Sequence, residues 1–371
     1  MKILFSGTAL HKGFSLAASI VPSSAMKQIL QGVKLEVPAP GSGLPEAELT
    51  ATDLEVLVKY RVPAKACEGE GSIVLPSSRT NNIFREWSGN EEISVSVDDG
   101  HCTLQSKGGC FKILGDDPMQ FPKISKTDVA EFVEIDGEIL GGMVEKVAYA
   151  ASSIKALNVY SGIFVKISGD TIIMVGSDMS RLAVVKRKIH NPSHVAMSGI
   201  VAVKCLSFLQ RFVSECKGIL KVGIGESQIH FIGERGEVIS QLIEGKYPNY
   251  EDVIPKNNDK KVEVNRDEML SAVRMASFVS NEEYRVVDFS LTKGKLAIFS
   301  TAANVGEAAL EIAAQYDGPD YTNTFNPDYI LDFLKISDSE TITIELGEIS
   351  DAALFRTGHE TLNVMTSVDW K

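Results

Sequence analysis

Polar and apolar residues alternate along most of this chain, and the alternation predicts a protein built mainly of β-strands. Residues 93–97 read Ile-Ser-Val-Ser-Val before Asp98-Asp99-Gly100, and residues 220–224 run into a turn at Gly225. A period of two with β-branched residues and a following turn signal is typical of half-buried strands joined as hairpins. The strands are therefore expected to form antiparallel sheets with one covered face.

Six segments depart from this alternation and predict helices. In one of them Leu140, Met143 and Val147 follow the spacing of a helix with one apolar face. The six predicted helices cover residues 8–20, 78–87, 138–150, 204–214, 266–279 and 328–335. Helices that cover one face of antiparallel sheets give an α+β fold.

The order of predicted elements repeats about every third of the chain. Asp53 and Asp178 occupy matching turns between two strands and lie 125 positions apart, and Ala302 follows Asp178 by 124 positions. A period of this length is too long for a solenoid and fits duplicated globular domains. We therefore predict three tandem domains, each of about two helices and eight strands, over residues 1–127, 128–257 and 258–371.

The composition of the 371 residues limits the class of protein. Hydrophobic residues make up 44% and charged residues 23%, and no apolar run is long enough to span a membrane. The first residues lack the apolar stretch of a secretory signal, so we expect a cytoplasmic protein with no membrane partner. The net charge of −12 disfavours nucleic-acid binding by a globally basic surface but leaves room for a local basic face.

Candidate catalytic and metal-binding groups lack a supporting pattern. The five cysteines are irregularly spaced and form no CxxC pair, which favours free thiols over disulfides or a zinc site. Asp53 and Asp178 could serve as paired carboxylates of an enzyme, but aspartate also favours turns. His190 and His194 have the spacing of a helical metal site, but Pro192 between them disfavours a helix. We expect no enzymatic activity, no metal and no cofactor.

Several longer motifs resemble the bacterial DNA polymerase III beta subunit family, the sliding clamps. The longest is Gln-Leu-Ile-Glu-Gly-Lys-Tyr-Pro-Asn-Tyr-Glu-Asp-Val-Ile-Pro-Lys at residues 241–256. Ser-Asp-Met-Ser-Arg-Leu-Ala at 177–183, Ser-Asn-Glu-Glu-Tyr-Arg at 280–285 and Phe-Asn at 325–326 also match, and residues 50–55 resemble the first-domain counterpart. The matches follow the family's order in all three thirds, so the resemblance covers essentially the whole chain.

The resemblance implies three tandem copies of a DNA-clamp domain, and two chains joined head to tail as a ring with helices inside and sheets outside. Such a homodimer encircles duplex DNA without reading its sequence, slides along it and performs no reaction. It tethers the DNA polymerase III catalytic subunit, the clamp loader and other proteins with a clamp-binding motif. The alternative is a clamp-like peptide-binding scaffold with weak or lost DNA encirclement. It stays open because an arginine of some family members aligns with Ser24 and because the C-terminus departs from the family's usual ending.

The resemblance also implies a peptide pocket between the second and third domains and a contact between chains. The pocket residues would be Ser177, Met179, Arg181, Leu182, Pro248, Val253, Asn326, Tyr329, Ile349, Asn363 and Met365. The contact between chains would use Phe111, Phe278 and Val279. Asp252 stands where the family often has a cation, and the C-terminus lacks the usual Met-Pro-x-Arg ending, which leaves the preferred docking motif open.

Cations on the predicted inner helices would contact DNA phosphates. Lys204, Ser207, Arg211 and Ser214 share one helical face by their spacing. The predicted DNA-facing residues are Arg79, Arg85, Lys204, Arg211 and Arg274, with Lys27 and Lys155 as replacements for the arginine missing at Ser24. The last helix fits this prediction less well, because Asp328 and Asp332 accompany its cation.

Overall fold

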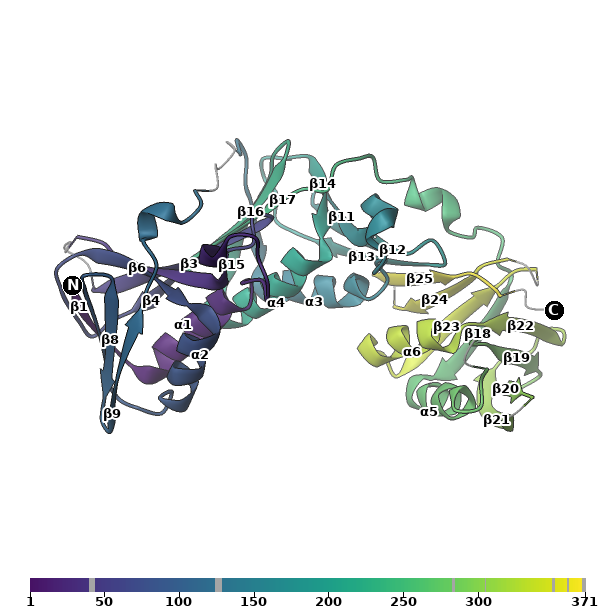
Figure 1. The fold of residues 1–371 in the computed structure, drawn as a ribbon. Coiled ribbons are helices and arrows are strands. Elements are labelled where there is room, and N and C mark those ends of the chain that lie inside the picture. Colours follow the sequence, from purple (N-terminus) through teal and green to yellow (C-terminus); the bar gives the residue numbers. More distant parts are fainter. Residues whose placement is uncertain are drawn as a thin grey trace. The chain divides into compact units, whose positions relative to one another are not determined.

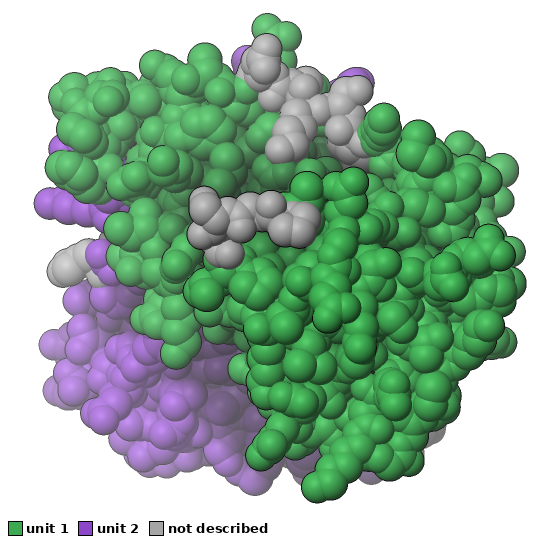
Figure 2. All heavy atoms as spheres, turned by 90° about the vertical axis from the view of Figure 1, so that its left-hand side faces the viewer, with its two compact units in different colours: residues 1–141, 190–197, 204–242 green, residues 142–189, 198–203, 243–371 purple. Residues whose placement is uncertain are grey.

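The computed structural model describes residues 1–39, 44–123, 129–281, 284–303, 305–348, 351–358 and 360–368, and only the backbone of residues 155–157. The chain forms two compact units, shown in different colours in Figure 2. Unit 1 holds residues 1–141, 190–197 and 204–242, and unit 2 holds residues 142–189, 198–203 and 243–371. The second predicted domain is thus shared between the units, and the three predicted domain boundaries stay a prediction.

The helices come in three pairs, as the repeat predicted (Figure 1). Their bounds are α1 (Gly7–Ala18), α2 (Ser77–Glu86), α3 (Gly137–Ala148), α4 (Val203–Cys216), α5 (Arg266–Ser277) and α6 (Pro327–Ile336). Three of the helices begin at a side chain that caps free backbone N–H groups. Asp136 Oδ1 accepts from Glu138 N at 2.8 Å, and Asn265 Oδ1 accepts from Asp267 N at 2.9 Å. Such caps satisfy donors that have no partner inside a helix.

The strands form antiparallel sheets, as predicted. A 5-stranded sheet has the order β5 (Ala66–Glu68), β1 (Lys2–Phe5), β7 (Ile93–Asp98), β8 (His101–Ser106) and β9 (Gly109–Leu114). An 8-stranded sheet has the order β10 (Val133–Asp136), β15 (Ile219–Ile224), β16 (Gln228–Gly233), β17 (Gly236–Gln241), β4 (Val56–Pro63), β3 (Glu46–Thr52), β2 (Gly32–Val37) and β6 (Gly71–Pro76).

A 12-stranded sheet contains the remaining strands. Its order is β14 (Met197–Ala202), β11 (Gly162–Ser168), β12 (Thr171–Ser177), β13 (Arg181–Lys188), β25 (Thr361–Met365), β24 (Ala353–Thr357), β23 (Thr341–Leu346), β18 (Lys260–Asn265), β21 (Gly306–Gln315), β20 (Lys295–Ala302), β19 (Val287–Thr292) and β22 (Tyr321–Phe325). The pairs β4–β17 and β13–β25 each join strands of two successive repeats. These pairs explain why the second repeat is divided between the units.

Helices cover one face of the sheets through apolar side chains. In unit 1 the rings of Phe14 on α1 and Phe84 on α2 meet edge to face at 5.1 Å. Helix α1 approaches β4 so closely that a Cβ at Gly13 would lie 2.4 Å from Val62 Cγ2, so a larger residue would push the helix off the sheet.

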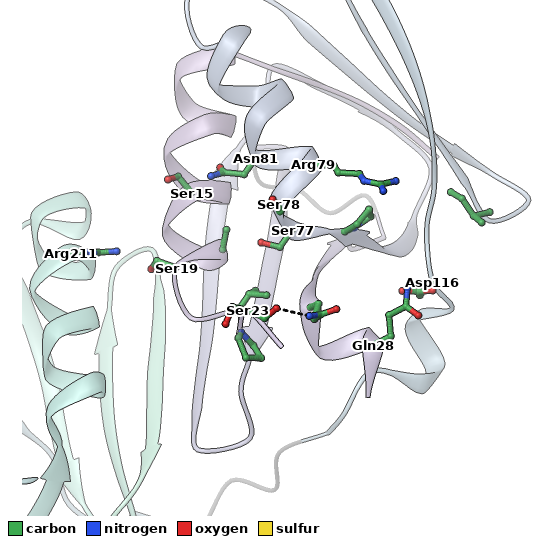
Figure 3. Close-up of a pocket in the computed structure, with 16 residues that line it drawn as sticks. Ser15, Ser19, Ser23, Gln28, Ser77, Ser78, Arg79, Asn81, Asp116 and Arg211 are labelled. Atoms are coloured by element: carbon green, nitrogen blue, oxygen red, sulfur yellow. Dashed lines mark hydrogen bonds between the residues drawn. The ribbon is translucent and has the colours of Figure 1, made fainter. Parts of the chain in front are cut away.

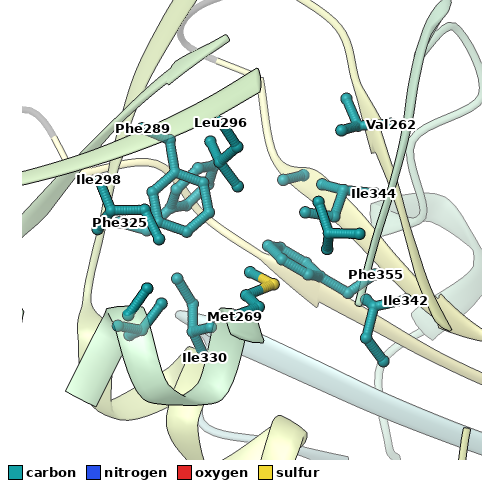
Figure 4. Close-up of a cluster of buried hydrophobic side chains, with 14 of the residues drawn as sticks. Val262, Met269, Phe289, Leu296, Ile298, Phe325, Ile330, Ile342, Ile344 and Phe355 are labelled. Carbon is teal, nitrogen blue, oxygen red and sulfur yellow. The ribbon is translucent and has the colours of Figure 1, made fainter. Parts of the chain in front are cut away.

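In unit 2, Met269 on α5 and Ile330 on α6 point toward Phe289, Phe325 and Phe355 of the sheet (Figure 4). The Phe289 and Phe325 rings lie 5.3 Å apart and the Phe325 and Phe355 rings 6.0 Å apart. All five residues are buried, so these rings and the two helices form one continuous core.

A second apolar cluster of unit 2 contains Leu182, Val184, Tyr247 and Tyr250. Tyr247 stacks on Phe164 with ring centres 5.2 Å apart. Side chains alternate between the two faces of a strand, so Leu182 and Val184 of β13 lie on one face of the sheet and Ala183 and Val185 lie on the other. This cluster lies on the Leu182 face. It fixes the segment of the longest family-like motif against the sheet.

In the described part of the chain, no helix is long and apolar enough to cross a bilayer. No group of three or more histidine, cysteine, aspartate or glutamate side chains is placed there to hold a metal ion.

Candidate functional site

The turn between β12 and β13 is closed by the side chains of Ser177 and Asp178. Ser177 Oγ donates to Arg181 O at 2.8 Å and accepts from Met179 N at 3.2 Å. Asp178 Oδ1 accepts from Ser180 N at 3.0 Å and from Arg181 N at 2.9 Å. These bonds hold Met179 at a φ of 76° with 57% of its surface exposed.

The turn between β3 and β4 repeats this arrangement. Thr52 Oγ1 donates to Val56 O at 2.8 Å and accepts from Leu54 N at 3.0 Å. Asp53 Oδ1 accepts from Glu55 N at 3.0 Å and from Val56 N at 2.7 Å, and Leu54 has a φ of 79°. The turn role predicted for Asp53 and its counterpart is confirmed.

Arg181 is held by partners from three elements. Its Nε donates to Asp178 Oδ2 at 3.0 Å, its Nη1 to Asp332 Oδ2 at 2.9 Å and its Nη2 to Tyr149 O at 2.7 Å. Its Cζ lies 4.5 Å from the centre of the Tyr329 ring and 5.4 Å from that of Tyr149. A guanidinium bonded and stacked in this way fixes both the turn and Tyr329 on α6.

Strand β25 pairs with β13 and so brings Asn363 and Met365 close to Arg181 and the Asp178 turn. Met365 pairs with Arg181 and Asn363 with Ala183, and both residues have only 2% of their surface exposed. Asn363 Oδ1 accepts a hydrogen bond from the Tyr149 hydroxyl. Burial raises the pKa of Tyr149, so its hydroxyl remains a donor at neutral pH.

The other predicted pocket residues are partly accounted for. Asn326 begins α6, where its Oδ1 accepts from Asp328 N at 2.8 Å. Leu182 is buried beside Tyr247, which precedes the exposed Pro248. Val253 ends the short 3-10 helix η4 (Tyr250–Val253) and is 58% exposed. Ile349 lies outside the described residues.

The ten pocket residues that the structure describes all belong to unit 2. Contacts link Ser177, Arg181, Asn363 and Tyr329 into one network. Exposed Met179, Pro248 and Val253 supply apolar surface, and Arg181 and Asn326 supply polar groups, which is the chemistry of a peptide-docking site. Sequence reasoning missed Tyr149, although an aromatic residue at the end of α3 is a weak signal for a packing role.

A cavity of about 750 Å³ in unit 1 is lined by polar groups of three helices (Figure 3). Arg79 and Asn81 of α2, Ser15 of α1 and Arg211 of α4 surround it. The predicted polar face of α4 is exposed at Lys204, Ser207, Arg211 and Ser214. Two arginines and several hydroxyls around one hollow suit binding of phosphate oxygens.

The predicted DNA-facing cations differ in whether a nearby carboxylate neutralises their charge. Lys204 is ion-paired with the nearly buried Asp53, and Arg85 Nε lies 3.8 Å from Glu86 Oε1. Of the predicted DNA-facing residues, four are exposed and form no ion pair with a described carboxylate: Lys27, Arg79, Arg211 and Arg274. The side chain of Lys155 lies outside the described residues.

The residues predicted to join two chains lie on β9 and just after α5. Phe111 on β9 is 45% exposed and its ring centre lies 5.2 Å from that of Trp87. Phe278, at the end of α5, is 73% exposed, and Val279 is half-buried. Large exposed apolar groups of this kind suit a contact with another molecule.

Three family models match successive parts of the chain. The DNA polymerase III beta subunit N-terminal, central and C-terminal domains match residues 1–125, 134–249 and 251–364. The beta sliding clamp of Chlamydia muridarum is 28% identical over 351 residues, covering 94% of this chain and 93% of that protein. The beta sliding clamp of Pseudomonas aeruginosa is 27% identical over 348 residues, covering 93% of both chains.

Solved structures give the same result. A DNA polymerase sliding clamp from Pseudomonas aeruginosa aligns over 100% of both chains with a TM-score of 0.92 and 25% identity. A sliding clamp from Bartonella birtlesii bound to griselimycin aligns over 100% of both chains with a TM-score of 0.91 and 25% identity.

Three tandem copies of one helix-and-sheet domain, aligned over their whole length with solved sliding clamps, define the class of DNA sliding clamps. The chain belongs to the bacterial DNA polymerase III beta subunit family, the beta sliding clamps.

Proposed function

We propose that two copies of this chain close head to tail into a ring around duplex DNA and tether replication proteins to it. The observation that carries the ring is the repeated way in which successive repeats join. Strand β4 follows the Asp53 turn of the first repeat and pairs with β17, the last strand of the second repeat. Strand β13 follows the Asp178 turn of the second repeat and pairs with β25, the last strand of the third repeat. By the same rule β21, which follows the corresponding turn of the third repeat, should pair with β9, the last strand of a first repeat.

The edges of these two strands are available. Strand β9 pairs only with β8 in the described part of the chain. Strand β21 pairs with β20 along its length but with β18 only at Ala314 and Gln315, so among the described residues positions 306–313 have one edge without a partner strand. Because β9 and β21 are free edges, each would gain a partner by pairing with the other strand of a second copy.

The internal junctions also suggest the register of this contact. Val56 pairs with Ser240, and Arg181 pairs with Met365. In both pairs, the first residue of one strand lies opposite the fifth residue of the other. The same rule would place Gly306, the first residue of β21, opposite Ile113, the fifth residue of β9 in the second copy. Ala308 would then lie opposite Phe111 of that copy. Phe111, Phe278 and Val279 would then lie in the apolar part of the interface, while Glu307 would face Lys112.

A closed ring reconciles the acidic chain with a DNA partner. The ring cannot leave DNA sideways, so weak contacts from each cation suffice and sliding stays possible. The proposed contacts are Arg79, Arg211, Arg274 and Lys27, with smaller contributions from the ion-paired Lys204 and Arg85 and with Lys155. These side chains would touch phosphates without reading bases.

The docking network around Arg181 would receive peptide motifs of partner proteins. We propose the catalytic subunit of DNA polymerase III, the clamp loader and other proteins with such a motif as partners. The clamp would catalyse no reaction, need no cofactor and act in the cytoplasm on the nucleoid. The scaffold alternative has no observation in its favour.

Size-exclusion chromatography with light scattering tests the ring. We expect a mass of about twice 40.3 kDa. Retention on nicked circular DNA after loading, with rapid loss once the circle is cut, would support encirclement. A stable monomer at micromolar concentration that is never retained on circular DNA would overturn the ring and favour the scaffold.

A further inference from the structure

Three lysines lie on the two strands that flank β12 in the 12-stranded sheet. Lys166 on β11 and Lys186 on β13 are both register partners of Ile173 on β12. Lys188 pairs with Thr171, two positions further along. Directly paired residues share one face of a sheet, so the three lysine side chains lie on the same face.

This face carries unbalanced positive charge. Lys166, Lys186 and Lys188 are exposed, and none of them forms an ion pair with a described carboxylate. The nearby carboxylate of Glu360 is taken by Arg187, whose Nη1 lies 2.6 Å from its Oε2. In a chain of net charge −12, the face is a local reversal of sign.

The lysines continue the strand that begins at the docking network. Leu182, Val184, Lys186 and Lys188 occupy alternate positions of β13 and therefore share a face. At about 3.4 Å per residue, Lys186 lies roughly 14 Å and Lys188 roughly 20 Å along the strand from Leu182. Tyr247 and Tyr250 pack on Leu182 and Val184, so a docked peptide passes over them and needs at least about four to six extended residues to cover that distance.

We propose that Lys166, Lys186 and Lys188, here called the lysine face, bind a short acidic run in the docking segment of a partner protein. The acidic run lies about four to six residues from the apolar residue that reaches Leu182. This inference rests on the docking function proposed above and adds a charge requirement to its partners.

The geometry favours an acidic peptide over a nucleic acid. The backbone positions of the three lysines span an area of about 10 by 7 Å, given the spacing of strands and of alternate residues. That area matches two or three carboxylates of one extended segment. A nucleic-acid backbone would need a longer track of cations than three lysines.

The test compares two labelled peptides by fluorescence anisotropy on the full-length protein. The core probe is Ser-Leu-Ser-Leu-Phe, and the extended probes add a Gly-Ser-Gly-Ser linker and three glutamates at either end. One extended probe should bind about three- to thirty-fold more tightly than the core probe at low salt, and the gain should shrink in about 0.5 M salt. Equal affinity of all probes would overturn the inference and leave docking intact.

Charge-reversal variants locate the effect. The triple variant Lys166→Glu, Lys186→Glu, Lys188→Glu should lose the gain while it keeps its affinity for the core probe. A matched variant with glutamates at three exposed lysines of unit 1, Lys107, Lys217 and Lys221, changes the net charge equally and should keep the gain.

Three outcomes would separate the explanations. An undiminished gain in the lysine-face variant would overturn the inference. Failure of the core probe to bind any variant would overturn the docking function itself. Binding of a single-stranded oligonucleotide that depends on the lysine face, with no gain from glutamates, would replace the peptide by nucleic acid.

Discussion

Arg181 Nη1 donates to Asp332 Oδ2 at 2.9 Å, and this ion pair joins the turn of the second repeat to helix α6 of the third. The Arg181 side chain is only 12% exposed, so its interactions are partly shielded from water. Its guanidinium also lies over the Tyr329 ring. One side chain therefore positions both a backbone turn and an aromatic group of the proposed docking site.

Arg181→Lys should weaken docking. A lysine cannot donate to three partners and stack on an aromatic ring at once. We expect affinity for a docking peptide to fall about tenfold or more, with unfolding made easier by about 1–3 kcal/mol. Arg285→Lys is the control, because Arg285 makes a more exposed ion pair with Asp328 at 2.8 Å and should cost less than about 1 kcal/mol. Equal losses in both variants would contradict the role of Arg181.

Met179→Gly and Leu54→Gly form a matched pair. Both native residues adopt a positive φ that side chains disfavour, at 76° and 79°. Glycine removes that strain, so each variant should keep its stability or gain up to about 1 kcal/mol in thermal unfolding. Only Met179→Gly should weaken peptide binding, because its exposed side chain belongs to the proposed docking site. Equal loss of binding in Leu54→Gly would place docking at the first turn as well.

The helices and the two aspartate turns were predictable because their signals are local and recur along the chain. Helix α5 begins at the predicted residue, and the Asp178 turn follows from aspartate's own preferences. The partners of Arg181 were not predictable in this way. Asp332 lies 151 positions away in sequence, and only the fold brings it to the turn.

Charge on helices is equally dependent on tertiary contacts. Asp328 and Asp332 made the last helix look too acidic for a DNA-facing role. Their carboxylates are engaged by Arg285 and Arg181. Conversely, Lys204 appears as a free cation in the sequence but pairs with Asp53. Helical spacing identifies an exposed face, but it does not show which of its charges are neutralised.

Arg79→Glu with Arg211→Glu should shorten the retention of the clamp on nicked circular DNA. The two arginines line one cavity, and reversing them introduces repulsion with phosphate. Arg85→Glu is the comparison, since Arg85 already lies beside Glu86 and should have a smaller effect. All variants should remain dimers in light scattering. Unchanged retention of the double variant at low salt would exclude these arginines as DNA contacts.

The thiols should divide into two classes. Cys67 and Cys110 are accessible, whereas Cys102, Cys205 and Cys216 are buried. Burial raises the pKa of each buried thiol to about 12 from an ordinary value of 9.0. Two thiols should therefore react quickly with a disulfide reagent at pH 8, and three only after unfolding.

The raised pKa values of the three buried thiols predict that the protein becomes less stable at alkaline pH. Below pH 9 these three thiols are protonated in both states and do not oppose folding. Between pH 9 and about 12 they ionise only in the unfolded chain, so the free energy of unfolding should fall as pH rises. Denaturant titrations from pH 8 to 11 measure this slope. Cys205→Ala should make the slope shallower than in the wild type.

Ring closure through β9 and β21 can be tested with a native cysteine. Cys110 is exposed on β9, and the register inferred from the internal junctions places Ala309 of the second copy opposite it. In Ala309→Cys, a short bismaleimide should link two chains in high yield. Ala308→Cys moves the new thiol to the other face of β21 and should link poorly. Efficient linking in Ala308→Cys with none in Ala309→Cys would mean a register shifted by one residue, which would also turn Phe111 away from the end of α5. Linking in neither variant, despite a dimeric mass, would place the contact between chains on strands other than β9 and β21.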